Sequence, residues 1–271
     1  MSTIDVNGTT LYYERRGDGP PVLFISGTGG DAGYFTTVAD ALADEYTTVT
    51  YDRRANSRSP RPAGWDAAPI AEQADDAAGL LRALDLAPAV GYGLSSGAMI
   101  LTDLALRHPD VLTGAVLAEP PIVGASSTPE AVGAGAKALV DEGMAVGGPA
   151  AAMELFVRYA DADEVFESLD PELQARVRGN GEVFFGLEMA SVMSYHPGAE
   201  QLARVEVPCV VTAGVDHRDP GSNLHWFYES AQWLAAGLGT EVVETPGGHV
   251  PMWTHPQAFV EILRPILNKL S

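Results

Sequence analysis

The sequence has few of the features that mark a secreted or membrane protein. Its single cysteine, Cys209, lies in the apolar run from Val207 to Ala213, so we expect a small buried hydrophobic side chain rather than a disulfide partner or a nucleophile. No apolar stretch of about 18 residues occurs, and residues 1–16 alternate around an Asn7-Gly8 turn, which indicates a β-hairpin and not a signal peptide. We therefore expect a soluble, cytoplasmic protein.

Positive charge is also scarce. The 16 lysine and arginine residues face 36 aspartate and glutamate residues, which gives a formal net charge of −20. Such a surface repels nucleic acids and anionic membranes, so we expect neither as a partner. The sequence contains no metal-ligand cluster, phosphate loop or dinucleotide fingerprint, and we expect no metal and no cofactor. The oligomeric state stays open.

Apolar runs and helical stretches alternate along most of the chain. Strand-like runs occur at 21–26, 46–51, 88–93, 113–118, 207–213 and 240–245, and helical stretches include 35–45, 69–84 and 96–107. This alternation predicts an α/β fold, with a mostly parallel, doubly wound sheet that has helices on both faces and follows an N-terminal antiparallel hairpin. In such sheets ligands bind at the carboxyl ends of the strands.

One serine stands between two glycines at a predicted turn from strand to helix. The segment is Gly93-Leu94-Ser95-Ser96-Gly97, a G-x-S-x-G pattern. A sharp turn of this kind holds its central residue in a strained, exposed conformation, and side chains at the flanking glycines would clash across the turn. The pattern predicts that Ser95 presents its hydroxyl to a substrate.

Two other loops follow predicted strands and carry matching chemistry. The strand Val22–Ile25 runs into Ser26-Gly27-Thr28-Gly29-Gly30, and the strand at 240–245 runs into Pro246-Gly247-Gly248-His249. A neutral imidazole can take a proton from a serine and return it, because its ordinary pKa of about 6.5 lies near neutral pH. His249 is the histidine that lies in a glycine loop after the last predicted strand.

With these segments the sequence resembles the α/β-hydrolase superfamily over nearly its whole length. The resemblance implies that Ser95 is the nucleophile and His249 the general base, and that the backbone N–H groups of Thr28 and Ser96 form the oxyanion hole. Two departures from the family pattern occur. Ser26 stands where the oxyanion loop usually has histidine, and the loop at 51–60 lacks both of its usual glycines.

The acidic member of the triad has more than one candidate. The resemblance favours Asp216, which follows the strand at 207–213 and lies four residues before Pro220. Asp219 is a weaker second choice. Glu119 is the alternative, because it follows the strand at 113–118 and some relatives carry their acid there.

Between residues 122 and 204 the alternation of strands and helices breaks. The segment has predicted helices at 129–142, 149–160 and 171–195 and many large apolar side chains. The resemblance implies a helical cap at 122–204 inserted into a core of 1–121 and 205–271. The apolar side chains favour a substrate with an apolar acyl or alcohol group. The arginines of the loop at 51–61 are expected to bind neighbouring loops or acidic side chains rather than a substrate carboxylate.

These features predict a serine hydrolase that cleaves a small-to-medium, mostly apolar carboxylic ester or lactone through an acyl-enzyme intermediate. Two alternatives stay open. In the first, the same triad serves other chemistry, such as perhydrolysis or a lyase step. In the second the chain is a ligand-binding member of the fold whose triad has drifted.

Overall fold

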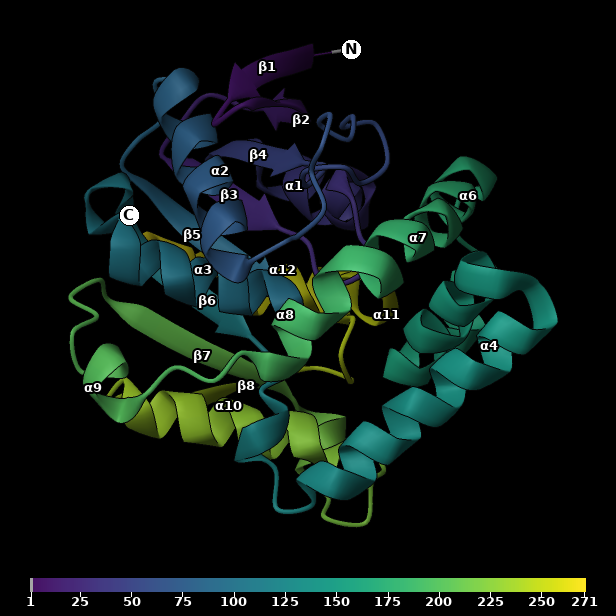
Figure 1. The fold of residues 1–271 in the computed structure, drawn as a ribbon. Coiled ribbons are helices and arrows are strands. Elements are labelled where there is room, and N and C mark those ends of the chain that lie inside the picture. Colours follow the sequence, from purple (N-terminus) through teal and green to yellow (C-terminus); the bar gives the residue numbers. More distant parts are fainter. Residues whose placement is uncertain (1) are drawn as a thin grey trace.

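A single eight-stranded sheet forms the centre of the protein (Figure 1). The computed structural model describes residues 2–271, with all of their side chains except those of 161–164. The strand order is β1-β2-β4-β3-β5-β6-β7-β8; β1 and β2 run antiparallel to their neighbours, and the other neighbouring pairs are parallel. The strands are β1 (Ser2–Val6), β2 (Thr9–Arg16), β3 (Pro21–Ile25), β4 (Thr47–Tyr51), β5 (Ala89–Leu94), β6 (Leu112–Ala118), β7 (Cys209–Gly214) and β8 (Val242–Thr245).

This sheet confirms the predicted fold class. The Asn7-Gly8 turn joins β1 to β2 with positive φ angles of 45° and 72°, which a tight hairpin turn requires. Helices cover both faces of the central parallel strands, so all five residues of β4, three of which are threonine, and all six of β5 are buried.

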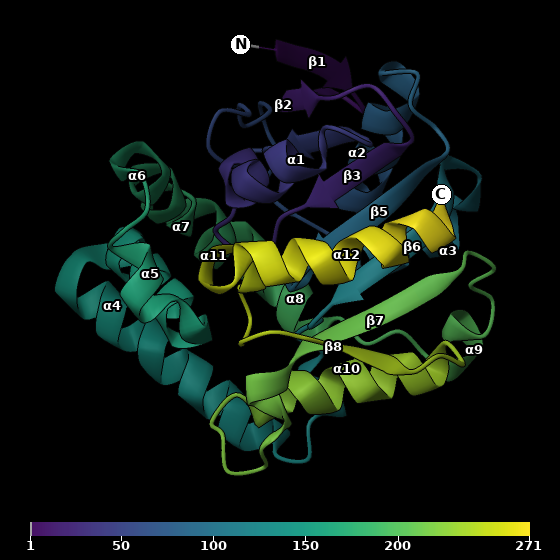
Figure 2. The same ribbon diagram turned by 180° about the vertical axis from the view of Figure 1, so that it is seen from behind.

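Helices lie on both faces of the sheet. On one face α1 (Thr36–Leu42) contacts α12 (Pro256–Leu270), as Figure 2 shows, and on the other α2 (Ile70–Ala83) contacts α3 (Ser96–Arg107). α12 buries Phe259, Leu263, Leu267 and Leu270, whose spacing of three or four residues places them on one side of the helix. The other helices and 3₁₀ turns outside residues 129–194 are η1 (Ala32–Phe35), η2 (Pro109–Val111), η3 (Val123–Ala125), α9 (Ala199–Leu202), η6 (Val215–Arg218), α10 (His225–Gly237) and α11 (Pro251–Thr254).

The segment from 122 to 204, called the helical insertion below, connects β6 to β7. In Figure 1 its helices between residues 129 and 183 stand to one side of the sheet, and its end, with α9, lies at the opposite side of the view. Its backbone leaves the helical conformation at Gly147 and Gly148, where the sequence separates two predicted helices. That the insertion is a cap domain of its own stays a prediction. Its main elements are α4 (Pro129–Val157), η4 (Arg158–Ala162), α5 (Asp163–Phe166), α6 (Pro171–Gly179), α7 (Gly181–Val183), the π-helical turn η5 (Phe184–Glu188) and α8 (Met189–Ser194).

Cys209 begins β7 and is partly buried. Burial raises the pKa of its thiol to about 12, so the group stays protonated near neutral pH. A thiol in this state is a poor nucleophile, as the sequence predicts. Within residues 2–271, the helices are too short or too polar to cross a lipid bilayer.

Candidate active site

Ser95 lies at the turn between β5 and α3. Its φ and ψ angles are 56° and −126°, a conformation that side-chain-bearing residues rarely adopt. A Cβ on Gly93 would lie 2.4 Å from the carbonyl oxygen of Gly97, and one on Gly97 would lie 2.2 Å from that of Ile25. Both flanking positions therefore need glycine, and the turn has the geometry of the predicted nucleophile elbow.

The loop after β3 lies directly against this turn. A Cβ on Gly27 would meet the Cβ of Ser95 at 2.8 Å, and the Thr28 hydroxyl lies 3.3 Å from that of Ser96. Ser96 is the first residue of α3, so its N–H has no acceptor within the helix and lies at the positive end of the helix dipole. Thr28 and Ser96 thus lie beside Ser95, as the predicted oxyanion hole requires.

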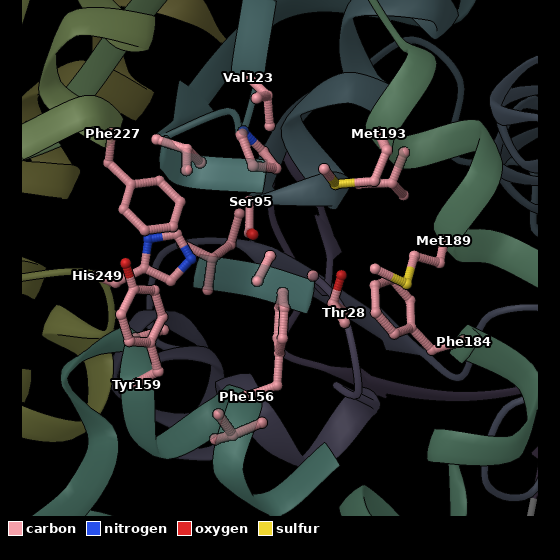
Figure 3. Close-up of a pocket in the computed structure, with 18 of the residues that line it drawn as sticks. Thr28, Ser95, Val123, Phe156, Tyr159, Phe184, Met189, Met193, Phe227 and His249 are labelled. Atoms are coloured by element: carbon pink, nitrogen blue, oxygen red, sulfur yellow. The ribbon is translucent and has the colours of Figure 1, made fainter. Parts of the chain in front are cut away.

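His249 lies in the loop after β8 and lines the same cavity as Ser95 (Figure 3). Its ring is nearly buried and packs against that of Phe227, with 4.3 Å between the ring centres. In the view of Figure 3, Ser95 lies between His249 on one side and Thr28 on the other. The structure therefore brings the predicted nucleophile, base and oxyanion loop together.

The carboxylate that contacts His249 is that of Glu119, at the end of β6. Its Oε2 accepts a 2.6 Å hydrogen bond from His249 Nδ1, and its Oε1 accepts 2.8 Å bonds from His217 Nδ1 and from the Gly214 N–H. Glu119 has a φ of 42°, which is unusual outside glycine and brings its side chain under the end of β7. Nothing in the sequence indicated that the second histidine, His217, would contact Glu119.

Glu119 is fully buried, yet it is held in its charged form. Burial raises the pKa of its carboxyl group, but the hydrogen bonds from His217 and His249 lower it further, to about 2. An ionised carboxylate can only accept hydrogen bonds, so the Nδ1 atoms of both histidines carry the proton. The Nε2 atom of a neutral His249 is then left as the acceptor, which is the tautomer that a general base needs.

Asp216, the acid favoured by the sequence, does not occupy this position. Its side chain is exposed, and its backbone N–H donates to the Gly247 carbonyl at 3.1 Å. The 3₁₀ turn η6 buries the next side chain, His217, and leaves those on either side of it in solvent. Asp219 is exposed as well, and its carboxylate accepts the N–H of Gly221. Glu119, and not Asp216, therefore makes the contact with His249 that the sequence predicted for Asp216.

The ionised state of Glu119 predicts how a substitution affects stability at different pH values. The pKa of its carboxyl group falls from an ordinary 4.5 to about 2 on folding. A lowered pKa stabilises the folded protein above the unfolded value, and that contribution is lost as the pH falls through the folded value. We expect Glu119→Gln to lower the free energy of unfolding most at about pH 6 and progressively less below about pH 4. Urea unfolding of both proteins over this range measures the difference, and a difference independent of pH would contradict an ionised Glu119.

The cavity above Ser95 is mostly apolar. Its lining residues carry no carboxylate, ammonium or guanidinium group in the part of the chain that the structure describes. The helical insertion supplies much of the cavity wall. Phe184, Met189 and Met193 lie on the Thr28 side of the view in Figure 3, and Tyr159 lies beside His249. A neutral substrate with an apolar group fits such a surface.

The arginines of the loop at 51–61 bind protein groups, as expected. Arg54 forms a buried ion pair with Asp76 at 2.6 Å, and Arg58 pairs with Asp52 at 2.7 Å. Asp52 also accepts the backbone N–H groups of Ala32 and Arg58. These contacts hold the loops next to the site, and none of the arginines lines the cavity within the described residues.

A comparison with known proteins gives the family. The sequence profile of the alpha/beta hydrolase family matches residues 22–262, and the chain belongs to this family. The uncharacterized hydrolase YraK of Bacillus subtilis (strain 168) is 33% identical over 270 residues, which cover 98% of this chain and 96% of the relative. Zearalenone hydrolase of Bionectria ochroleuca is 26% identical over 267 residues, 96% of this chain and 95% of the relative.

Solved structures show the same fold. A thermophilic esterase from Thermogutta terrifontis has a TM-score of 0.80 at 19% identity, and the match covers 100% of this chain and 99% of the esterase. The enol-lactonase from Burkholderia xenovorans LB400 has a TM-score of 0.70 at 22% identity, with 98% and 100% covered. At sequence identities this low, the structural similarity shows a shared fold and not a shared function.

Proposed function

We propose that the protein is a serine hydrolase that cleaves a mostly apolar carboxylic ester or lactone through an acyl-enzyme, with Ser95, His249 and Glu119 as its triad. The observation that carries the proposal is the contact between Glu119 and His249 in a cavity that also exposes Ser95. We assign the acid role to Glu119 and not to Asp216, because an orienting carboxylate must contact the imidazole that it orients.

The reaction follows from the positions of these groups. His249 Nε2 takes the proton of the Ser95 hydroxyl as the oxygen attacks the ester carbonyl, and the N–H groups of Thr28 and Ser96 stabilise the oxyanion. The tetrahedral intermediate collapses, the C–O bond to the alcohol breaks, and His249 gives its proton to the leaving oxygen. Water then repeats the sequence on the acyl-enzyme and releases the acid. Glu119 stabilises the imidazolium in both halves.

Hydrolysis of p-nitrophenyl esters tests this proposal. Acyl chains of graded length, a set of lactones and zearalenone, on which the fungal relative is named as acting, form the panel. We expect hydrolysis of the neutral apolar esters or lactones, and a rapid first release of about one nitrophenolate per protein if deacylation is the slower step. Turnover of charged substrates alone, or of no compound in the panel, would contradict the proposal.

The insertion wall of the cavity should set the size of the substrate. Met189 and Phe184 lie on this wall (Figure 3), so Met189→Trp fills part of the space that an acyl or alcohol group would occupy. We expect kcat/KM to fall by about 10-fold or more for the longest substrates and to change little for acetate esters, since each excluded methylene forfeits about 0.8 kcal/mol of burial. The matched control is Met144→Trp, because Met144 lies on the insertion surface and is 38% exposed. An equal loss for all chain lengths would remove Met189 from this role.

A further inference from the structure

Arg53 connects three parts of the protein from a fully buried position. It follows β4 in the chain. Its guanidinium forms a bidentate ion pair with Glu188, with Nη1–Oε1 at 2.7 Å and Nη2–Oε2 at 3.1 Å. Glu188 ends the π-helical turn η5 of the helical insertion and is itself 1% exposed. Two amide side chains complete the cluster. Gln73 Oε1 accepts a 2.5 Å hydrogen bond from Arg53 Nη1, and Asn56 Nδ2 donates a 3.0 Å hydrogen bond to Glu188 Oε1. A buried pair with both partners hydrogen-bonded holds its groups in one geometry.

The same guanidinium reaches the loop beside Ser95. Arg53 Nη2 lies 3.3 Å from the carbonyl oxygen of Gly27, which also accepts the N–H of Gly30 at 3.1 Å. That carbonyl belongs to the peptide group whose N–H is the one on Thr28. A trans peptide group is planar, with its C=O and N–H pointing in opposite directions. Fixing the Gly27 oxygen toward Arg53 therefore fixes the Thr28 N–H on the opposite side.

The carbonyl of Gly29, the residue on the other side of Thr28, is held from the insertion as well. Asn180, which follows α6, donates from Nδ2 to the Gly29 carbonyl at 2.9 Å, and its Oδ1 accepts the Ser57 N–H at 2.7 Å. Asn180 is 2% exposed. The carbonyls of the two residues that flank Thr28 are thus bound by side chains that the insertion supplies or holds in place.

We propose that Arg53, held by Glu188, is a positioning residue for the oxyanion hole, so that the helical insertion sets the direction of the Thr28 N–H. This inference rests on the proposed serine-hydrolase function. A charged donor on the Gly27 oxygen also polarises the peptide group and strengthens its N–H as a donor. The benefit appears when negative charge develops on the substrate oxygen, so it acts on kcat rather than on KM.

The test compares Arg53→Lys with wild type. A lysine ammonium keeps the charge but lacks the planar fork that reaches Glu188 and Gly27 together. We expect kcat to fall by about 10- to 100-fold with KM within about 3-fold, since loss of a whole oxyanion donor costs roughly 100- to 1,000-fold elsewhere. The inhibition constant of a trifluoromethyl ketone, which forms a tetrahedral adduct with the serine, should rise by a similar factor.

Two further variants separate positioning from folding. The double variant Arg53→Met with Glu188→Met leaves neither charge unpaired in the core, and we expect the same loss of kcat in a folded protein. The control is Arg176→Met, which removes another ion pair between the insertion and this loop region, 2.5 Å from Asp31, without touching the carbonyls of Gly27 or Gly29. We expect its kcat to stay within about 3-fold of wild type, because the buried Asp31 keeps its ion pair with Arg58 and its bond from the Gly33 N–H. If the Arg53 variants lose thermal stability but keep kcat and ketone affinity, the inference is wrong.

Amide hydrogen exchange gives a readout that does not depend on activity. Exchange in residues 27–30 should speed up in both Arg53 variants and not in Arg176→Met, whose partner Asp31 lies outside this segment. If wild type hydrolyses no ester, the proposed function fails, and exchange alone then decides whether Arg53 holds the loop. Unchanged exchange in residues 27–30 would overturn the positioning role.

Discussion

Replacing Ser95 with alanine should lower kcat for ester hydrolysis by about 10⁵- to 10⁶-fold, as loss of the nucleophile does in serine proteases. The loss is large because the other groups have no oxygen to activate once the hydroxyl is gone. The fold should survive, since the hydroxyl sits at a cavity-lining turn whose conformation is set by Gly93 and Gly97. Steady-state kinetics and thermal unfolding of the variant measure both effects.

The matched control is the neighbouring serine. Ser96→Ala keeps the backbone N–H at the start of α3 and removes only the hydroxyl that lies 3.3 Å from that of Thr28. We expect kcat within about 10-fold of wild type, because the oxyanion donor is retained. Loss of activity in Ser96→Ala together with normal kcat in Ser95→Ala would show that the nucleophile had been assigned one residue too early.

Glu119→Gln should lower kcat by on the order of 10⁴-fold. An amide at this position no longer stabilises the imidazolium, and it can present an N–H toward His249 Nδ1 and favour the wrong tautomer. The amide oxygen can still accept from the Gly214 N–H and His217, so we expect a folded but less stable protein. Measuring kcat and the free energy of unfolding of the same preparation separates the two effects.

Asp216→Asn is the matched comparison, because the same carboxylate-to-amide change is made at an exposed position. We expect kcat within about 3-fold of wild type and unchanged stability, as is usual for surface substitutions. The reverse pattern, an inactive Asp216→Asn and an active Glu119→Gln, would return the acid role to Asp216.

The tight turn at Ser95 could be predicted from sequence because its constraints are local. Ser95, the two glycines and the strand before them lie within a few residues of one another, and the close approach at Gly97 leaves glycine as the fitting residue. The parallel strands β3, β5 and β6 are also visible locally, as mostly apolar runs. The ends of strands are less well marked, and β8 begins at Val242, two residues after the predicted start.

The carboxylate that contacts His249 could not be identified from the sequence in this way. Asp216 and Glu119 both follow strands that lie next to each other in the sheet, so both carboxylates end at the same edge. The choice depends on the positive φ of Glu119 and on a single turn of 3₁₀ helix that buries His217 and exposes Asp216. Side-chain direction within one such turn leaves no periodic signal.

Contacts between segments far apart in the sequence could not be predicted either, because they leave no local pattern. Arg53 and Glu188 are 135 residues apart, and the predictable property of Arg53 was only that it would bind protein groups rather than substrate. The turn η5 that ends at Glu188 was predicted as part of a continuous helix at 171–195. This π-helical turn buries Phe184 and Glu188, and Glu188 pairs with Arg53, a contact that local propensity does not encode.

The most direct test of the proposed catalytic site is covalent labelling with a fluorophosphonate, followed by peptide mapping. We expect one adduct per protein, on Ser95, with a labelling rate that falls sharply in Glu119→Gln and stays near wild type in Asp216→Asn. Absence of an adduct on the folded wild-type protein, or an adduct on another residue, would contradict the assignment of Ser95 as the nucleophile.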